Sequence, residues 1–157
     1  MTVITHPRRK SRLATMIDSA GGVSVGVALT QARANIEAMR AQALMVIDAG
    51  ISALEALPAP GSPEDLPARL DQAYRATTTL IDAAGPFELH DLCRAAAGLC
   101  DLIGASDPQE AFDWRIVTVH ARSLRLLQTL PLEAAEERAR ILESLSEVIE
   151  RKLAQTG

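Results

Sequence analysis

Aromatic residues make up only 3% of this 157-residue chain, so its core cannot be built on large planar side chains. Apolar residues still account for 48% of the chain, which leaves Ala, Leu, Ile, Val and Met to fill the interior. These residues favour close packing of helices over a β-sandwich rich in Tyr and Phe. The composition therefore predicts an all-α protein, and the length suits one domain.

Cysteines and long apolar runs are also scarce. The two cysteines, Cys93 and Cys100, are too few for a disulfide scaffold. No apolar run approaches the roughly 20 residues that a membrane span needs, and the N-terminus has no charged-then-apolar leader before a cleavage site. We therefore expect a reduced, cytoplasmic protein without a membrane span.

The formal net charge is −4, and the two ends of the chain differ in sign. Arg8, Arg9, Lys10 and Arg12 precede Gly21-Gly22, with Asp18 as the one acidic residue of that segment. We expect residues 1–22 to form a disordered, mobile basic arm, either a solvated tail or an arm that docks on an acidic surface. Residues 23–157 are expected to form a single helical-bundle domain, whose acidic balance disfavours nucleic acid as a partner.

Apolar residues recur at steps of three, four or seven along five segments, which is the period of a helical stripe. The expected helices cover residues 28–57, 63–84, 87–103, 108–130 and 133–155, with Val23, Val25 and Val27 as a lead-in to the first. The first would be about 45 Å long, with Gly50 as the place where it could bend. The tight turn at Gly85-Pro86 makes the second and third helices an antiparallel hairpin. The prediction is an up-down bundle of about five helices.

Two stripes carry particular expectations. On the first helix, an apolar face could pair with a second copy of the chain; its members are Ile36, Met39, Ala43 and Ile47. On the fourth helix, the expected core positions are Phe112, Ile116, Val119, Leu126, Leu127 and Leu130. Cys93 and Cys100 are seven residues apart, so both should be small hydrophobes on the apolar face of the third helix.

Enzyme signatures are missing. The chain has no glycine-rich phosphate loop, no Gly-x-Ser-x-Gly elbow and no His-Glu-x-x-His. No histidine lies at metal-ligand spacing on the apolar stripe that carries the two cysteines, so zinc is not expected. We expect no metal, no cofactor and no enzymatic activity.

Only three histidines are present, and a phosphorylatable or acid-base histidine must reach solvent. His6 lies in the basic arm. His90 falls on the polar side of the third helix beside Arg94, so it should be exposed. His120 lies at the border of the apolar arc of the fourth helix and should be a partly buried packing residue, unless neighbouring helices leave one nitrogen open.

The strongest local pattern runs from Ala73 to Gly85, through Leu89, and on through Ala95-Ala96-Ala97 to Leu102. It resembles the helical hairpin of histidine phosphotransfer domains, in which a His-x-x-Lys-Gly sequence leads to a turn glycine. With Gly85 in the place of that glycine, the resemblance implies that Arg75 occupies the position of the phosphorylated histidine. Thr78 and Thr79 then replace the Lys-Gly pair.

Arg75 cannot relay phosphate, because a guanidinium stays protonated and is no nucleophile. Helical spacing instead places it on an exposed polar strip with Asp71 and Asp82. A response-regulator receiver domain presents an acidic pocket, so an exposed arginine there is either a docking contact or a solvated partner of Asp71.

The order of four further strings is similar to a small family of bacterial chemotaxis accessory proteins, CheE. The strings are Ala-x-x-Asn-Ile-Glu at Ala32–Glu37, Ala-Gly-x-Phe-x-Leu at Ala84–Leu89, Leu99-Cys100-Asp101-Leu102, and Val-His-x-x-Ser-Leu-Arg-Leu-Leu at Val119–Leu127. This resemblance spans most of the chain. It implies a small cytoplasmic protein of the chemotaxis system without established chemistry.

The resulting hypothesis is a non-enzymatic signalling adaptor that binds a receiver domain or another chemotaxis protein. The expected contact residues are Arg75, Thr78, Asp82, His90 and Arg94. Two alternatives stay open. One is an active histidine phosphotransferase that uses His120 or His90, and the other is a scaffold that forms a homodimer through the first helix.

Overall fold

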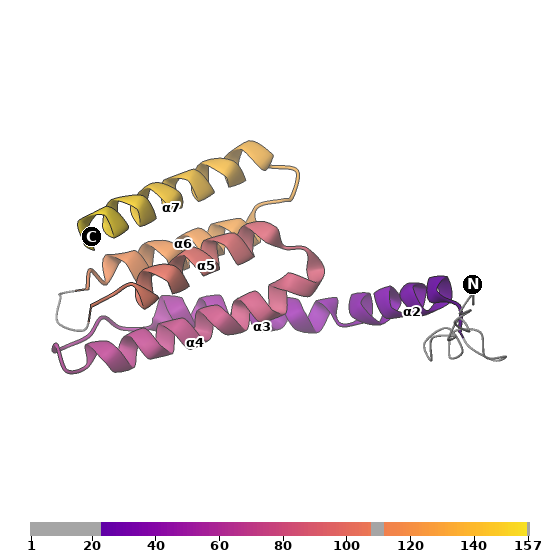
Figure 1. The fold of residues 1–157 in the computed structure, drawn as a ribbon, viewed down its shortest axis with the longest axis horizontal. Helices are drawn as coiled ribbons and strands as arrows, with labels where there is room; N and C mark the ends of the chain where they lie inside the picture. Colours follow the sequence, from indigo (N-terminus) through magenta and orange to yellow (C-terminus); the bar gives the residue numbers. More distant parts are fainter. Residues whose placement is uncertain (1–22, 108–111, 157) are drawn as a thin grey trace, which may run out of the picture. The chain divides into compact units, whose positions relative to one another are not determined.

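The computed structural model describes residues 23–107 and 112–156, and every regular element within them is helical (Figure 1). The elements are α2 (Val25–Ala38), α3 (Arg40–Ala56), α4 (Leu66–Ala84), the short 3-10 helix η1 (Gly85–Phe87), α5 (His90–Gly104), α6 (Arg115–Thr129) and α7 (Ala135–Thr156). The predicted all-α class is confirmed, with six α-helices among the described residues instead of about five in the chain. The basic arm predicted at residues 1–22 lies outside the described residues.

The chain divides into two compact units, residues 1–37 and residues 38–157. In the first unit, α2 has no buried residue, and the side chains of Val25, Val27 and Leu29 are exposed. The second unit contains α3 to α7 and holds the hydrophobic core. The candidate functional residues all lie in this second unit.

The prediction of one long helix over residues 28–57 is wrong, because the helix is interrupted at Met39. Met39 has φ −90° and ψ −6°, a turn conformation in the sparsely populated bridge region. Gly50 is not a bend but an interior residue of α3. A Cβ atom at Gly50 would lie 3.5 Å from the carbonyl oxygen of Ala76, so this glycine lies where α3 and α4 approach closely.

The start of α2 also differs from the prediction. Val25 and Val27 belong to the helix and are not an extended lead-in. The backbone N–H of Val27 donates a hydrogen bond to Oγ of Ser24 at 3.3 Å. A serine that accepts from the third residue beyond it is a typical helix N-cap, and this local signal outweighs the alternation of the valines.

The predicted antiparallel hairpin corresponds to α4, η1 and α5. Asp65 is the N-cap residue of α4, so the predicted start at Pro63 is wrong by three residues. The apolar spacing predicts a core stripe of Leu66, Leu70, Ala73, Thr77, Leu80 and Ala84; the last four are buried, and Leu66 and Leu70 are half-buried. After η1, Glu88 takes a left-handed conformation with φ 58°. The turn therefore extends further than predicted, and α5 begins at His90 and not at Phe87.

The helix predicted over residues 108–130 corresponds to α6, which is shorter and buries a different face from the predicted one. It begins at Arg115, whose backbone N–H donates to Oδ1 of Asp113 at 3.1 Å; of the expected start at residues 107–110, only Asp107 is described. Val119 and Leu126, predicted as core residues, are exposed. The buried face consists of Ile116, Val117, His120, Ala121, Leu124 and Leu127. These residues recur at helical spacing and form one face of α6. The face includes His120, which was predicted to lie at the border of the apolar arc.

The contacts between helices define how the bundle of α3 to α7 is arranged. α3 contacts α4 and α6, α4 contacts α5, and α5 contacts α6. α7 packs on α5 and α6, and within the bundle it lies on the far side of that pair from α3 and α4 (Figure 1). The bundle is thus four helices around a shared core, with a fifth helix laid along α5 and α6.

Candidate functional site

The predicted contact residues on α4 follow one strip of its surface. Arg75 and Asp82 are exposed, and Thr78 is half-buried beside α5. The Nε atom of Arg75 lies 2.8 Å from Oδ2 of Asp71, one turn earlier on the same helix. Because both side chains are more than half exposed, this pair leaves the guanidinium accessible.

Thr78 marks the seam between α4 and α5. Its hydroxyl donates to the carbonyl oxygen of Tyr74 at 3.0 Å. Burial raises the pKa of the Cys100 thiol on α5, and a hydrogen bond with the Thr78 side chain opposes that rise. Cys93 lies two turns before Cys100 on α5. Its Sγ is 4.0 Å from the carbonyl oxygen of Ile81, and burial also raises the pKa of its thiol. Both cysteines lie at this seam and are half-buried, whereas buried small hydrophobes were predicted.

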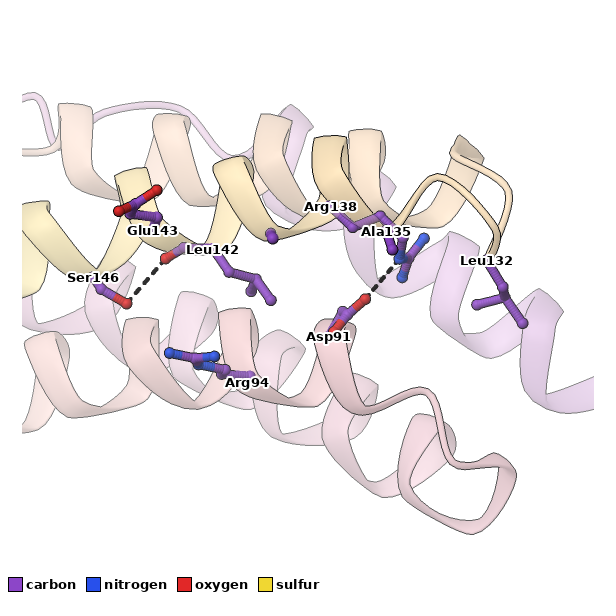
Figure 2. A pocket seen from close by; sticks show the side chains of 9 residues that line it. Asp91, Arg94, Leu132, Ala135, Arg138, Leu142, Glu143 and Ser146 are labelled. Carbon is purple, nitrogen blue, oxygen red and sulfur yellow. Dashed lines mark hydrogen bonds and ion pairs between the residues drawn. The ribbon is translucent and has the colours of Figure 1, made fainter.

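On α5, His90 and Arg94 lie one turn apart and are both exposed, as their helical positions predicted. Arg94 has no ion-pair partner within residues 23–107 and 112–156. In Figure 2 its side chain runs along α5 below Ser146 of α7. Arg94 thus joins the outer surface of α5 to the space between α5 and α7.

Two adjoining hollows follow the junction of α5 and α7. The larger, of about 590 Å³, is bounded by Asp91 and Arg94 of α5, by Leu132 and by one side of α7 (Figure 2). The smaller, of about 230 Å³, continues past Gly98 to Ile149. Because the two share Arg94, Leu142 and Ser146, they form one groove, which we call the α5–α7 groove.

Arg138 closes one end of this groove and was not among the residues predicted from the sequence. Its side chain is 6% exposed, and its Nε donates to Oδ2 of Asp91 at 2.6 Å. Its Nη1 donates to the carbonyl oxygens of Leu127 and Leu130, at 2.7 and 3.0 Å. These carbonyls end α6, whose last turn has no helical partner for them. One arginine of α7 therefore caps α6 and binds α5.

A sequence signal for Arg138 did exist. It precedes Leu142 by four positions and so lies on the apolar stripe of the last helix, which Leu142, Leu145, Ile149 and Leu153 continue at helical spacing. A charged residue on such a stripe is rarely buried without a partner. The sequence could thus have indicated a buried arginine, but not Asp91 as its partner.

His120 is fully buried, whereas partial burial was predicted. Its Nδ1–H donates to the carbonyl oxygen of Ile116 at 2.8 Å, which leaves the lone pair on Nε2. Nε2 is the only buried side-chain polar atom without a hydrogen-bond partner in the described part of the chain. Desolvation lowers the pKa of the imidazole, and the hydrogen bond to Ile116 opposes this.

A second cluster that the sequence did not reveal joins α3 to α6. The guanidinium of Arg125 donates to Oε2 of Glu55 at 2.8 Å and to Oγ of Ser52 at 2.7 Å, and it pairs with Asp48. The hydrogen bond from Arg125 lowers the pKa of Asp48. Arg125 bonds to three residues of α3 at once, so this cluster holds α3 and α6 together.

Comparison with known proteins adds no family. No protein-family model, curated protein or solved structure matches the chain. The resemblances to the phosphotransfer hairpin and to CheE therefore stay predictions from the sequence. Among the described helices, none combines the length and apolarity needed to cross a membrane. Residues 23–107 and 112–156 also bring together no group of three potential metal ligands.

Proposed function

We propose that this protein is a non-enzymatic adaptor of bacterial chemotaxis or two-component signalling. It binds a receiver domain or another signalling protein through the outer surface of the α4–α5 hairpin. One observation carries the proposal: the exposed Arg75 and Arg94 lie on neighbouring helices, and Arg94 has no ion-pair partner in the described residues.

Arginine suits such a contact for a physical reason. Its planar guanidinium presents five N–H donors in a geometry that matches a carboxylate. The acidic pocket of a receiver domain offers carboxylates. Asp82, two turns after Arg75, and His90, one turn before Arg94, supply a carboxylate acceptor and a ring N–H donor for the rim of the same contact.

The test is a titration of the purified protein with receiver domains of its host, with and without a phosphodonor. We expect Arg75→Glu and Arg94→Glu each to weaken binding at least tenfold, which is about 1.4 kcal/mol. Arg122→Glu on α6 is the matched control, because Arg122 is also exposed but lies on a helix outside the hairpin. Unchanged affinity in both hairpin variants, with folding confirmed by circular dichroism, would remove this surface from the contact.

An active phosphotransferase is the first alternative. His90 is exposed and could receive a phosphoryl group, whereas His120 is buried. Incubation with a phosphorylated receiver domain separates the two functions, because only the phosphotransferase acquires acid-labile, alkali-stable phosphate.

Homodimerisation is the second alternative, and the surface predicted for it needs correction. Ile36 and Met39 are exposed, but Ile47 is completely buried in the core of its own chain and cannot pair with a second copy. The exposed apolar residues of α2 still favour self-association. A monomer by light scattering at all concentrations would exclude it.

A further inference from the structure

The unpaired Nε2 of His120 lies directly beneath the α5–α7 groove. A Cβ atom placed on Gly98 would be 4.0 Å from Nε2. Gly98 lines the smaller hollow of the groove. Because α5 carries no side chain at this position, a gap in the surface of α5 leads from the groove to the imidazole.

Ile149 of α7 fills that gap. Its Cδ1 lies only 2.5 Å from the point that a Cβ on Gly98 would occupy. The terminal methyl group of Ile149 therefore stands where any side chain at position 98 would be. Ile149 itself is only half-buried, so the cover over His120 is a side chain at the edge of the bundle.

The two halves of α7 are held with unequal strength. The first half has Arg138, with its hydrogen bonds to α5 and α6, and the buried Leu142 and Leu145. Beyond Leu145, α7 has no buried residue among those whose side chains are described. Local opening occurs preferentially where few apolar contacts are buried.

Two features mark the limits of the weaker half. At its start, the hydroxyl of Ser146 donates to the carbonyl oxygen of Leu142 at 2.9 Å, a back-bond that often bends helices. Near its end, Lys152 interacts with Asp113, which lies just before α6: hydrogen bonding to Arg115 is the main cause that lowers the pKa of Asp113, and the charge of Lys152 adds a smaller effect. Attraction between these half-exposed groups is weak in water, so it can act as a releasable latch.

We propose that the segment of α7 from Ser146 to Lys152 is a hinged cover over His120. In a second conformation this segment is displaced, Ile149 leaves the gap at Gly98, and Nε2 of His120 becomes accessible from the α5–α7 groove. The closed state carries the cost of a buried acceptor without a donor, and opening removes that cost by admitting water or a ligand.

The open state has a defined chemistry. The hydrogen bond from Nδ1–H to Ile116 keeps the Nε2 lone pair directed at the gap. The floor of the groove then accepts a hydrogen bond, while Arg94 at its rim donates to anions.

Modification by diethyl pyrocarbonate tests the cover, because this reagent acylates an imidazole only at an accessible, unprotonated nitrogen. Site-resolved mass spectrometry would follow His120, with the exposed His90 as internal reference. We expect His120 to react more slowly than His90 in the parent protein. Ile149→Ala should raise the rate at His120 at least tenfold, and Lys152→Gln, which removes one weak attraction, should raise it about two- to fivefold.

Arg151→Gln is the matched control for Lys152→Gln, since Arg151 bonds only to Glu147 of its own helix among the described residues. It should leave the rate at His120 unchanged. Urea distinguishes local from global opening: a local cover gives a rate that depends weakly on urea below the unfolding transition. The proposal is overturned if the rate in every variant follows global unfolding with its full urea dependence, or if Ile149→Ala and Lys152→Gln react as slowly as the parent.

Discussion

Replacing Arg138 with methionine should destabilise the bundle more than any change at an exposed arginine. Methionine keeps part of the apolar stem but removes the guanidinium. That group is 6% exposed and binds Asp91 and the carbonyl oxygens of Leu127 and Leu130. Its loss therefore affects α5, α6 and α7 together.

The magnitude follows from what is left without a partner. Breaking a buried ion pair by removing one partner costs about 3–5 kcal/mol, and each buried acceptor left without a donor costs about 1–3 kcal/mol. Because the side chain of Asp91 is 35% exposed, water can replace part of its lost bonding. We therefore expect a loss near the lower end of the range, about 3 kcal/mol. For a chain of this length that corresponds to a fall in Tm of roughly 6–12 °C.

Urea unfolding followed by circular dichroism measures the change. Arg140→Met is the control: Arg140 lies on the same helix, its side chain is 76% exposed, and its Nη2 is 3.8 Å from Oε2 of Glu136. It should change the free energy of unfolding by less than about 0.5 kcal/mol. A loss below about 1 kcal/mol in Arg138→Met would refute the reasoning, because it would mean that solvent replaces all three bonds.

Two further predictions concern single positions. Gly50→Ala should stabilise the protein by about 0.5–1 kcal/mol, because a Cβ there meets Ala76 and Leu80 at ordinary contact distances of 3.5 and 3.7 Å; a lower urea midpoint would show that α3 and α4 cannot accommodate the methyl group. Desolvation lowers the pKa of folded His120 below its ordinary value of about 6.5, so its contribution to stability is complete above that pH and is lost as the pH falls towards the folded pKa. The free energy of unfolding, measured from pH 8 to 5, should decrease on acidification in the parent and less so in His120→Leu; equal slopes would contradict the buried neutral imidazole.

Helical periodicity predicted most of the fold. The stripe of α4 and the exposed positions of Arg75, His90 and Arg94 follow from 3.6-residue spacing, because a helix places residues three and four apart on one face. Two predictions from this spacing were wrong. The break at Met39 has no glycine or proline to mark it, and Val119 and Leu126 fit an apolar arc that the observed packing leaves in solvent.

The candidate site was predicted less completely than the fold. Exposure on one helix face depends on local spacing, so the residues of the α4–α5 surface could be found from the sequence. The α5–α7 groove depends on small side chains of one helix meeting large ones of another. Gly98 and Ile149 are 51 positions apart, and nothing in their local sequence indicates that one fills the gap left by the other.

The sequence by itself determined that this chain is helical, where most helices run and which of their faces carry charge, because these properties depend on residues within a few positions of one another. Only the tertiary structure decided the partners across helices. It buried His120 with one nitrogen unpaired, joined Arg138 to Asp91 across 47 residues, and placed Ile149 over Gly98. Such contacts depend on how the helices rotate and shift to fill one shared core, and that information belongs to the packed chain as a whole.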